Sequence, residues 1–531
     1  MQTRTRKLAG AAIIVMSSTI LSRISGYLRE TLIANKIGFN AVGDAYNAAF
    51  LVPNLMYELL LGGALAAALI PILSGYIEKD DEEEGWKVVG TFINITFVAM
   101  LIFCILGMIF TPQIIPILDK SFSKKDILTQ ILAIKLTRIL FPSVAFLMLA
   151  GMCNGVLNSY HRFAAAAYGP VIYNIGGVLS LIFFGESSSL GAERVAYGVM
   201  LSAVAYFIFQ FSASYKNLKY FHFKIFPKHP GFIRMFKLAV PSLLSSAISQ
   251  VNLIVSSVFT TLAAVGSLTM FNTANRTWQL PLGIFAQSLG VALLPSMSAR
   301  LAVGDVKEFK GIFNKGLKAV LFLSVPSAIA FIVLREPIIR TLFKFTNFTE
   351  VNVVSTGYVL MFFSVALVAQ SVQAIVGRAF FASNDTKTPL FVGLSTIVVN
   401  SVFSYLLYYP MGVAGMALAN SISSAVYATV MIFILNKRMK GLHLDKVLVF
   451  TIKVTIAACI MGAVLYPINL ILPININSKI NQVFFLGLEA VLGTVLYFGV
   501  TMLLKLDEAV SIYKMALHRV GGVARKFGIK S

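Results

Sequence analysis

The feature that most constrains this chain is a series of long apolar stretches. Each holds about 20 residues, the length that an α-helix needs to cross the hydrocarbon core of a bilayer. We count about fourteen of them, at residues 8–36, 44–76, 87–110, 127–157, 163–184, 193–214, 232–262, 267–297, 312–334, 351–381, 388–408, 411–435, 446–471 and 481–504. Only 12% of all residues are charged, about half the fraction usual in soluble domains. The sequence therefore predicts an all-α polytopic membrane protein.

The distribution of positive charge predicts the orientation of these helices. The formal net charge is +22, but Lys and Arg fall in short clusters between the apolar stretches and not on one basic domain, which argues against nucleic-acid binding. With the N-terminus in the cytoplasm, roughly 29 Lys and Arg residues lie in cytoplasmic segments and roughly 9 lie outside. We therefore expect both termini to be cytoplasmic.

Cysteine and histidine give no sign of metal or disulfide chemistry. Cys104, Cys153 and Cys459 all lie inside apolar stretches without a paired spacing, and the histidines form no HExxH pair. We expect the three cysteines to be buried packing residues and expect no metal site.

An internal repeat divides the chain. Residues 46–53 resemble 274–281, and residues 64–74 resemble 288–298, at offsets of about 228 and about 224 residues. Both segments are predicted to run from the outside to the inside, so the repeat is parallel. Chance similarity between apolar helices is the alternative. The repeat predicts two pseudo-symmetric six-helix halves, residues 1–225 and 226–440, then two additional transmembrane helices in 441–505 and a basic amphipathic cytoplasmic tail in 506–531.

Charged side chains at membrane depth are costly and mark candidate sites. Arg23, Arg29 and Glu30 lie in the first predicted helix and Arg276 in the eighth. At 1.5 Å per residue, the three arginines lie about 10 to 20 Å from the outer helix ends. Arginine binds phosphate and carboxylate bidentately and keeps its charge when buried. We therefore predict a cationic cavity for an anionic substrate, although a structural pair of Arg23 with Glu30 is an alternative.

Amides could complete the lining of this cavity. Asn275 and Gln279 flank Arg276, and Asn154, Asn158 and Asn174 lie in other predicted helices. The spacing places Arg23 and Glu30 on one helical stripe, with Arg29 about a third of a turn away. A kink at Ser25 and Gly26 could turn Arg29 toward the same cavity.

Several segments resemble the MviN/MurJ family of lipid II flippases, within the multidrug/oligosaccharidyl-lipid/polysaccharide exporter superfamily. The resemblance rests on residues 22–30, 43–54, 62–65, 70–71 and 274–283. It implies that Arg23, Arg29 and Arg276 match the family's essential cavity arginines and that Asp44 and Asn174 match further functional positions. It also implies that the last two helices form a groove for a polyprenyl tail. The chain departs from the family at Tyr57, Gly62 and Asn275, where some members carry charged residues.

The resemblance implies a transporter and not an enzyme. We expect a flippase in the bacterial plasma membrane that moves lipid II, a polyprenyl-diphosphate-linked sugar-peptide, to the outer leaflet by alternating access for peptidoglycan synthesis and cell shape. Expected partners are this substrate, membrane lipids and proteins of cell-wall synthesis; no cofactor is expected, but the membrane potential would favour outward movement of an anion. Alternatives are an O-antigen-type polysaccharide flippase or a multidrug exporter on the same scaffold, and a polyprenyl-dependent glycosyltransferase, for which no paired-acid motif is present.

Overall fold

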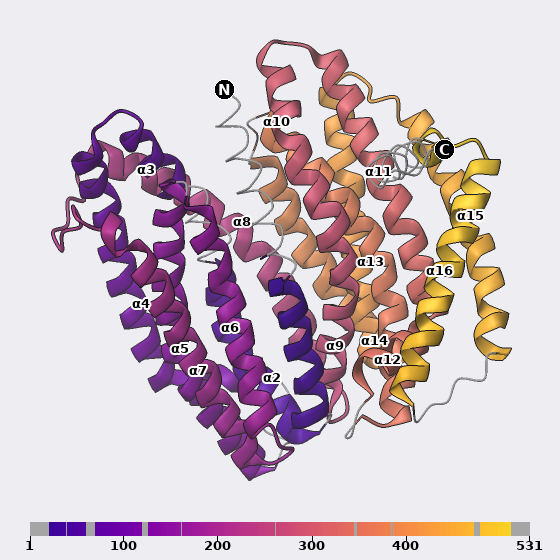
Figure 1. Ribbon diagram of the computed structural model, residues 1–531, viewed down its shortest axis with the longest axis horizontal. Coiled ribbons are helices and arrows are strands. Elements are labelled where there is room, and N and C mark those ends of the chain that lie inside the picture. The colour runs from indigo at the N-terminus through magenta and orange to yellow at the C-terminus, as the bar shows by residue number, and fades with distance from the viewer. Residues whose placement is uncertain are drawn as a thin grey trace, which may run out of the picture. The chain divides into compact units, whose positions relative to one another are not determined.

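The regular structure of the chain is helical throughout the part that the structure describes (Figure 1). The computed structural model describes residues 18, 21–38, 40–59, 69–118, 126–160, 162–260, 262–344, 348–383, 385, 387–471 and 478–510. No strand occurs among these residues. The predicted tail of 506–531 lies almost entirely outside them, as does the beginning of the first predicted span.

The helices follow one another along the chain in this order. A first helix of residues 21–32 continues into the π-helical turn η1. The further elements are α2 (Ala41–Leu59), α3 (Ile70–Ile77), α4 (Glu82–Leu118), α5 (Ile127–Ser159), α6 (Phe163–Phe184), α7 (Ser189–Ser214), η4 (Tyr215–Asn217), α8 (Pro230–Thr260), α9 (Ser267–Pro281), η5 (Leu282–Gln287), α10 (Ser288–Ala302), α11 (Val306–Val333), α12 (Arg335–Phe343), α13 (Glu350–Ala382), α14 (Lys387–Arg438), α15 (Leu444–Ile471) and α16 (Lys479–Leu503); η1 is Ile33–Ile37.

The predicted fold class is confirmed. Within the described residues, nine helices are long and apolar enough to cross a membrane. One of them, α14, runs for 52 residues but contains Gly412 at φ 54° and ψ −130°. This non-helical residue lies at the start of the twelfth predicted span, residues 411–435, just after the end of the eleventh, residues 388–408. Glycine reaches such a positive φ without a Cβ penalty, which explains why the break occurs here.

Some predicted boundaries are wrong. Helix α4 begins at Glu82 and ends at Leu118, well beyond the predicted 87–110. Its first turn carries three acidic residues, which stabilise a helix N-terminus, and it continues through Pro112 and Pro116. The short helix α12 was not predicted at all, because its mean polarity is too high for a membrane span.

Contacts divide the chain into two compact units. The first unit consists of Met1–Arg276 with Phe343–Asn352 and Asn400–Met416, and the second of Thr277–Leu342, Val353–Val399 and Ala417–Ser531. The predicted domain boundaries near residues 225, 440 and 505 stay a prediction.

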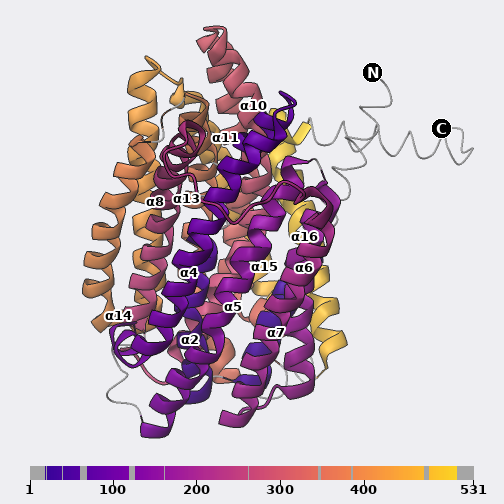
Figure 2. The same ribbon diagram turned by 90° about the vertical axis from the view of Figure 1, so that its left-hand side faces the viewer.

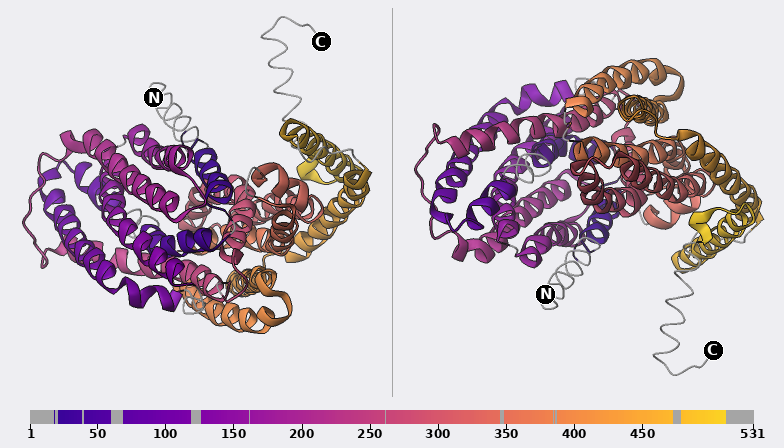
Figure 3. Two further views of the ribbon diagram at one scale, coloured as in Figure 1. Left: turned by 90° about the horizontal axis from the view of Figure 1, so that it is seen from below. Right: turned by 90° about the horizontal axis from the view of Figure 1, so that it is seen from above.

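The core of the first unit lies among helices α2 to α8. Helices α5, α6 and α7 pack side by side (Figure 2), and α4 packs on both α5 and α8. One buried cluster joins Tyr46 of α2 to Leu136 of α5 and Val195 of α7. Another joins Trp86 of α4 to Met148 of α5 and Met235 of α8. Seen close to end-on, the indigo-to-magenta helices of this unit form a packed bundle (Figure 3).

In the second unit, α15 packs between α11 and α16. Gly462 of α15 permits this close approach, because a Cβ there would lie 2.7 Å from Cγ2 of Ile329 in α11. The expectation that all cysteines are buried is wrong for Cys459, which is exposed on α15, whereas Cys104 and Cys153 are buried. The outer face of a membrane helix is as apolar as its packed face, so apolar neighbours in the sequence do not indicate burial.

Candidate substrate-binding site

Two of the predicted arginines meet at one carboxylate in the first unit. Nη2 of Arg29 lies 3.3 Å from Oε1 of Glu30, and Nε of Arg276 lies 3.7 Å from the same oxygen. We call Arg29, Glu30 and Arg276 the arginine cluster. It joins the first helix to α9, elements that are far apart in the sequence. The side chain of Arg276 is 44% exposed, so its guanidinium can still reach a ligand.

Arg29 is held by packing against α6. Its guanidinium carbon lies 5.5 Å from the centre of the Tyr173 ring, a cation–π contact. Gly177, one turn further along α6, leaves room for the arginine stem, since a Cβ there would lie 2.9 Å from Cδ of Arg29. Nε of Arg29 has no hydrogen-bond partner among the described residues. The side chain is therefore positioned by its stem, and its buried Nε–H is an unsatisfied donor among the described residues.

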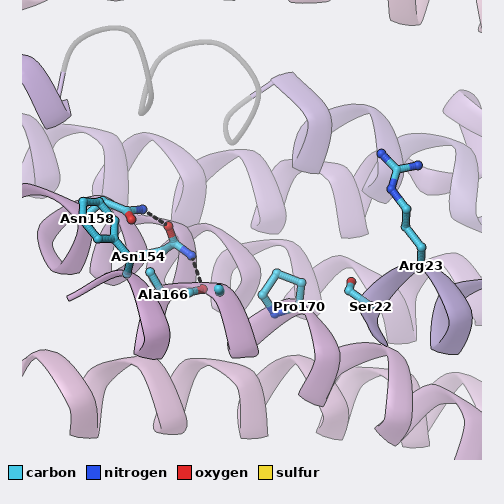
Figure 4. A pocket seen from close by; sticks show the side chains of 8 residues that line it. Ser22, Arg23, Asn154, Asn158, Ala166 and Pro170 are labelled. Atoms are coloured by element: carbon cyan, nitrogen blue, oxygen red, sulfur yellow. Dashed lines mark hydrogen bonds between the residues drawn. The ribbon is translucent and has the colours of Figure 1, made fainter. Parts of the chain in front are cut away.

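The third predicted arginine lines a separate cavity. Arg23 is exposed and, with Ser22, borders a cavity of about 470 Å³ in the first unit. At 1.5 Å per residue, six residues separate Arg23 from Arg29 by about 9 Å along the helix. Figure 4 shows Arg23 and Ser22 at one end of this cavity and the pair Asn154 and Asn158 at the other. Among the described residues that line it, none is acidic.

Amides fix the walls of this cavity. Nδ2 of Asn158 donates to Oδ1 of Asn154 at 2.7 Å, and Nδ2 of Asn154 donates to the carbonyl of Ala166 at 2.7 Å (Figure 4). Asn174 of α6 donates to the carbonyl and hydroxyl oxygens of Ser22, each at 3.2 Å. Asn174 therefore ties α6 to the first helix immediately before Arg23.

Asp44, in the first turn of α2, is 4% exposed and faces the N-terminal end of α9. Its Oδ2 accepts from the backbone N–H of Gly266 at 2.7 Å, and its Oδ1 accepts from the backbone N–H and the hydroxyl of Thr269 at 3.2 and 3.3 Å. The carboxylate thus caps a helix end, where backbone N–H groups otherwise lack partners. Asn47 strengthens the same junction, donating to the Thr269 hydroxyl at 3.0 Å.

The two predicted amides beside Arg276 differ in burial. Asn275 is 7% exposed on α9, and Gln279, one turn beyond Arg276, is partly buried. Helix α9 then gives way to the π-helical turn η5, as the first helix gives way to η1 after Glu30. Such turns are rare and often adjoin functional sites. Ser25 and Gly26 both lie within the first helix, and a kink at this pair stays a prediction.

The structure thus brings Arg29, Glu30 and Arg276 together and places Arg23, Asn154 and Asn158 around a cavity. Sequence reasoning missed Tyr173 and Gly177, although the pair Gly176 and Gly177 in an apolar helix signals a close approach. Among the described residues, no group of three His, Cys, Asp or Glu side chains could hold a metal ion.

Known proteins resemble this chain over most of its length. The family model described as "Lipid II flippase MurJ" matches residues 33–484. A probable lipid II flippase MurJ of Buchnera aphidicola subsp. Acyrthosiphon pisum is 28% identical over 476 residues, covering 89% of this chain and 92% of the relative. The lipid II flippase MurJ of Burkholderia cenocepacia is 26% identical, in an alignment that covers 81% of this chain and 84% of the relative.

Solved structures agree with this assignment. A solved structure of a lipid II flippase MurJ in an inward closed conformation superposes with a TM-score of 0.78 at 25% identity. The superposition covers 93% of this chain and 98% of the chain in that structure. An inward-facing multidrug transporter of the MATE family shares the fold, with a TM-score of 0.68 at 19% identity over 81% of this chain and 98% of its own. The match over residues 33–484 includes most of the helices described above, and on this basis the chain belongs to the lipid II flippase MurJ family.

Proposed function

We propose that this chain carries lipid II from the cytoplasmic to the outer leaflet of the bacterial plasma membrane by alternating access. Family membership supports a transporter and not an enzyme. The arginine cluster supports the substrate class, because two guanidinium groups share a single carboxylate. The observation that carries the proposal is this excess of positive charge where the first helix meets α9.

A diphosphate is a suitable ligand for such a site. Each guanidinium presents two N–H groups in the geometry of a phosphate, and the charge of arginine survives burial. Arg23 adds a further exposed cation beside the amides of the cavity. In this proposal, the arginines bind the diphosphate and the amides of the cavity contact the sugar-peptide, while the polyprenyl tail stays in the bilayer.

The membrane potential gives the transport a direction. Moving one negative charge outward through 100 mV is favourable by about 2.3 kcal/mol when the inside is negative. With the termini in the cytoplasm, as the distribution of Lys and Arg favours, the loaded site moves outward with the potential. The empty site is cationic, so the potential also favours its return to the inward-facing state. Lipids of the surrounding bilayer and proteins of cell-wall synthesis are the further partners that we propose.

A multidrug exporter is the second candidate because it shares the fold. An exporter of cationic drugs would need acidic groups in its cavity, but the lining of the described cavity contains Arg23 and no carboxylate. An O-antigen-type flippase would also carry a polyprenyl diphosphate. Only a direct comparison of head groups separates it from a lipid II flippase.

The test is transport of lipid II in proteoliposomes, read from the accessibility of the head group on each side. We expect Arg276→Ala to abolish transport, because the substrate loses the more exposed guanidinium of the arginine cluster. Arg300→Ala is the matched control, since Arg300 is also about half exposed but lies at the end of α10, 3.9 Å from Asp305. Full activity of a folded Arg276→Ala variant would remove the arginine cluster from the mechanism. Equal transport of an O-antigen precursor would favour the alternative.

A further inference from the structure

Helix α16 presents its polar side chains to the protein and its apolar side chains outward. Its buried residues recur at helical spacing, namely Gln482, Glu489, Gly493, Tyr497 and Thr501. Its outward side chains include Ile480, 85% exposed, and Phe484, 63% exposed. This polarity is the reverse of that of a soluble helix and suits a membrane span. It also brings one carboxyl, that of Glu489, inside.

Glu489 is buried where α16 packs on α15, with a single hydrogen bond to the described residues. Glu489 is 1% exposed, and α16, which carries it, packs along α15 (Figure 1). Oε1 accepts from Nδ2 of Asn469 in α15 at 3.0 Å. Oε2 is buried and has no hydrogen-bond partner among the described residues.

Positive charges near this carboxyl are engaged elsewhere. Lys479, at the start of α16, donates to the carbonyls of Arg340 and Thr341 at 2.9 and 3.2 Å. Lys453 of α15 donates to the carbonyl of Leu504, at the far end of α16. Between residues 454 and 471 of α15, and between residues 319 and 333 of α11, the sequence contains no charged residue.

Other titratable groups on these helices are turned to different partners. Tyr497 lies two turns along α16 and donates its hydroxyl to the carbonyl of Phe322 in α11 at 2.8 Å. On α15, Cys459 is exposed and Tyr466 is 54% exposed. In α12, Glu336 lies 3.9 Å from both Arg335 and Arg340. None of these groups supplies a counter-charge to Glu489.

An ionised carboxylate in this position would be very unfavourable. Burying an unpaired charge costs several kcal/mol, whereas burying a neutral polar group with one hydrogen bond costs far less. One amide donor, at Oε1, does not replace the hydration of a carboxylate. The neutral acid is therefore the form that fits the packed helix pair.

We propose that Glu489 is a proton-binding site. Its carboxylate takes a proton from bulk water, so that Oε2 becomes a hydroxyl while Oε1 keeps the hydrogen bond from Asn469. The proton is held as long as α16 packs on α15, and it returns to water when the chain unfolds. The site lies in the second unit, while the arginine cluster lies in the first, so it is additional to the proposed function.

Infrared spectroscopy of the full chain in lipid bilayers tests this directly, because a protonated carboxyl has a carbonyl band that a carboxylate lacks. We expect Glu489→Gln to lose one such band at neutral pH. Glu193→Gln is the matched control: Oε2 of Glu193 lies 2.7 Å from Nζ of Lys135, an ion pair with a cation that Glu489 lacks, so we expect its replacement to leave the band unchanged. Identical bands in wild type and Glu489→Gln would overturn the proposal.

Two further measurements guard against a folding defect in that variant. Asn469→Ala keeps the carboxyl and removes the donor to Oε1, so the band should remain and shift to higher frequency; loss of the band would contradict the neutral acid. Raising the pH from about 6 to about 9 should lower the melting temperature of wild type more than that of Glu489→Gln, because only wild type releases this proton on unfolding. Equal pH dependence would show that no proton is held there.

Discussion

Replacing Asp44 tests whether this carboxylate holds the fold or binds substrate. The resemblance to the family implies a functional position, but the structure makes Asp44 the cap of α9. Asp44→Ala would remove the acceptor of three hydrogen bonds, two from backbone N–H groups and one from the Thr269 hydroxyl. We expect this variant to lose stability even in the absence of substrate.

The size of this loss follows from the contacts. Hydrogen bonds to a charged group contribute about 1.5 to 3 kcal/mol each, and buried donors left without an acceptor add a penalty. The bonds share one carboxylate, so their contributions are not additive. We expect Asp44→Ala to cost about 3 to 4 kcal/mol and Asp44→Asn about 1 kcal/mol, since asparagine keeps an acceptor oxygen but loses the charge at the helix N-terminus.

Unfolding of the purified protein in mixed micelles, by denaturant titration, measures this loss. Asp305→Ala is the control, because Asp305 also caps a helix, accepting from the backbone N–H of Glu308 at 3.0 Å, but lies in an exposed position. We expect that control to cost about 1 kcal/mol or less. If Asp44→Ala is as stable as the control but no longer transports lipid II, the capping role is wrong and Asp44 contacts the substrate.

Three further variants probe other positions. Gly177→Ala should reduce transport several-fold while all charges remain, since the new Cβ would lie 2.9 Å from Cδ of Arg29; Gly499→Ala, with no atom within 4 Å of its Cβ, should have no effect in the same proteoliposome assay. Burial raises the pKa of Asp385, but hydrogen bonds from Thr388 and Arg438 outweigh it and lower the pKa to about 2. Ionised Asp385 therefore stabilises the fold by about 1 kcal/mol above about pH 4. When the free energy of unfolding is measured against pH, the advantage of wild type over Asp385→Asn should disappear below about pH 2. Gly412→Ala should cost about 1 to 2 kcal/mol in unfolding measurements, because φ is 54° there.

Hydropathy predicts the helices well, because every backbone polar group inside a bilayer must be bonded within its own helix. A long apolar run therefore has one stable structure. Hydropathy predicts much less about which face is buried. Cys459 faces outward from an apolar segment, whereas Glu489 faces inward from another. In lipid, the apolar side chain is suited to both environments, so only the polar side chains show which face is packed.

The sequence predicts which charged residues belong to the candidate site, but it does not predict which of them form ion pairs. Hydropathy placed the three arginines on the first and eighth predicted helices, and helical spacing put Arg23 on the stripe of Glu30. The structure pairs Glu30 with Arg29 and Arg276 instead. The sequence gives no measure of the approach of α9 to the first helix, nor of the room that Gly177 leaves beside Arg29. Both depend on tertiary packing.

The position of Glu30 has a consequence for turnover. A transport site must release its ligand as well as bind it, and two arginines without a counter-ion would hold a diphosphate tightly. A carboxylate about 6 Å from the anion repels it by about 3 kcal/mol at an effective dielectric constant of about 20, which weakens binding by about a hundredfold. Glu30 contacts both guanidinium groups, so it also keeps them in place while the site is empty. The same carboxylate therefore organises the cation pair and limits its affinity, and both effects favour a site that is loaded and emptied in every cycle.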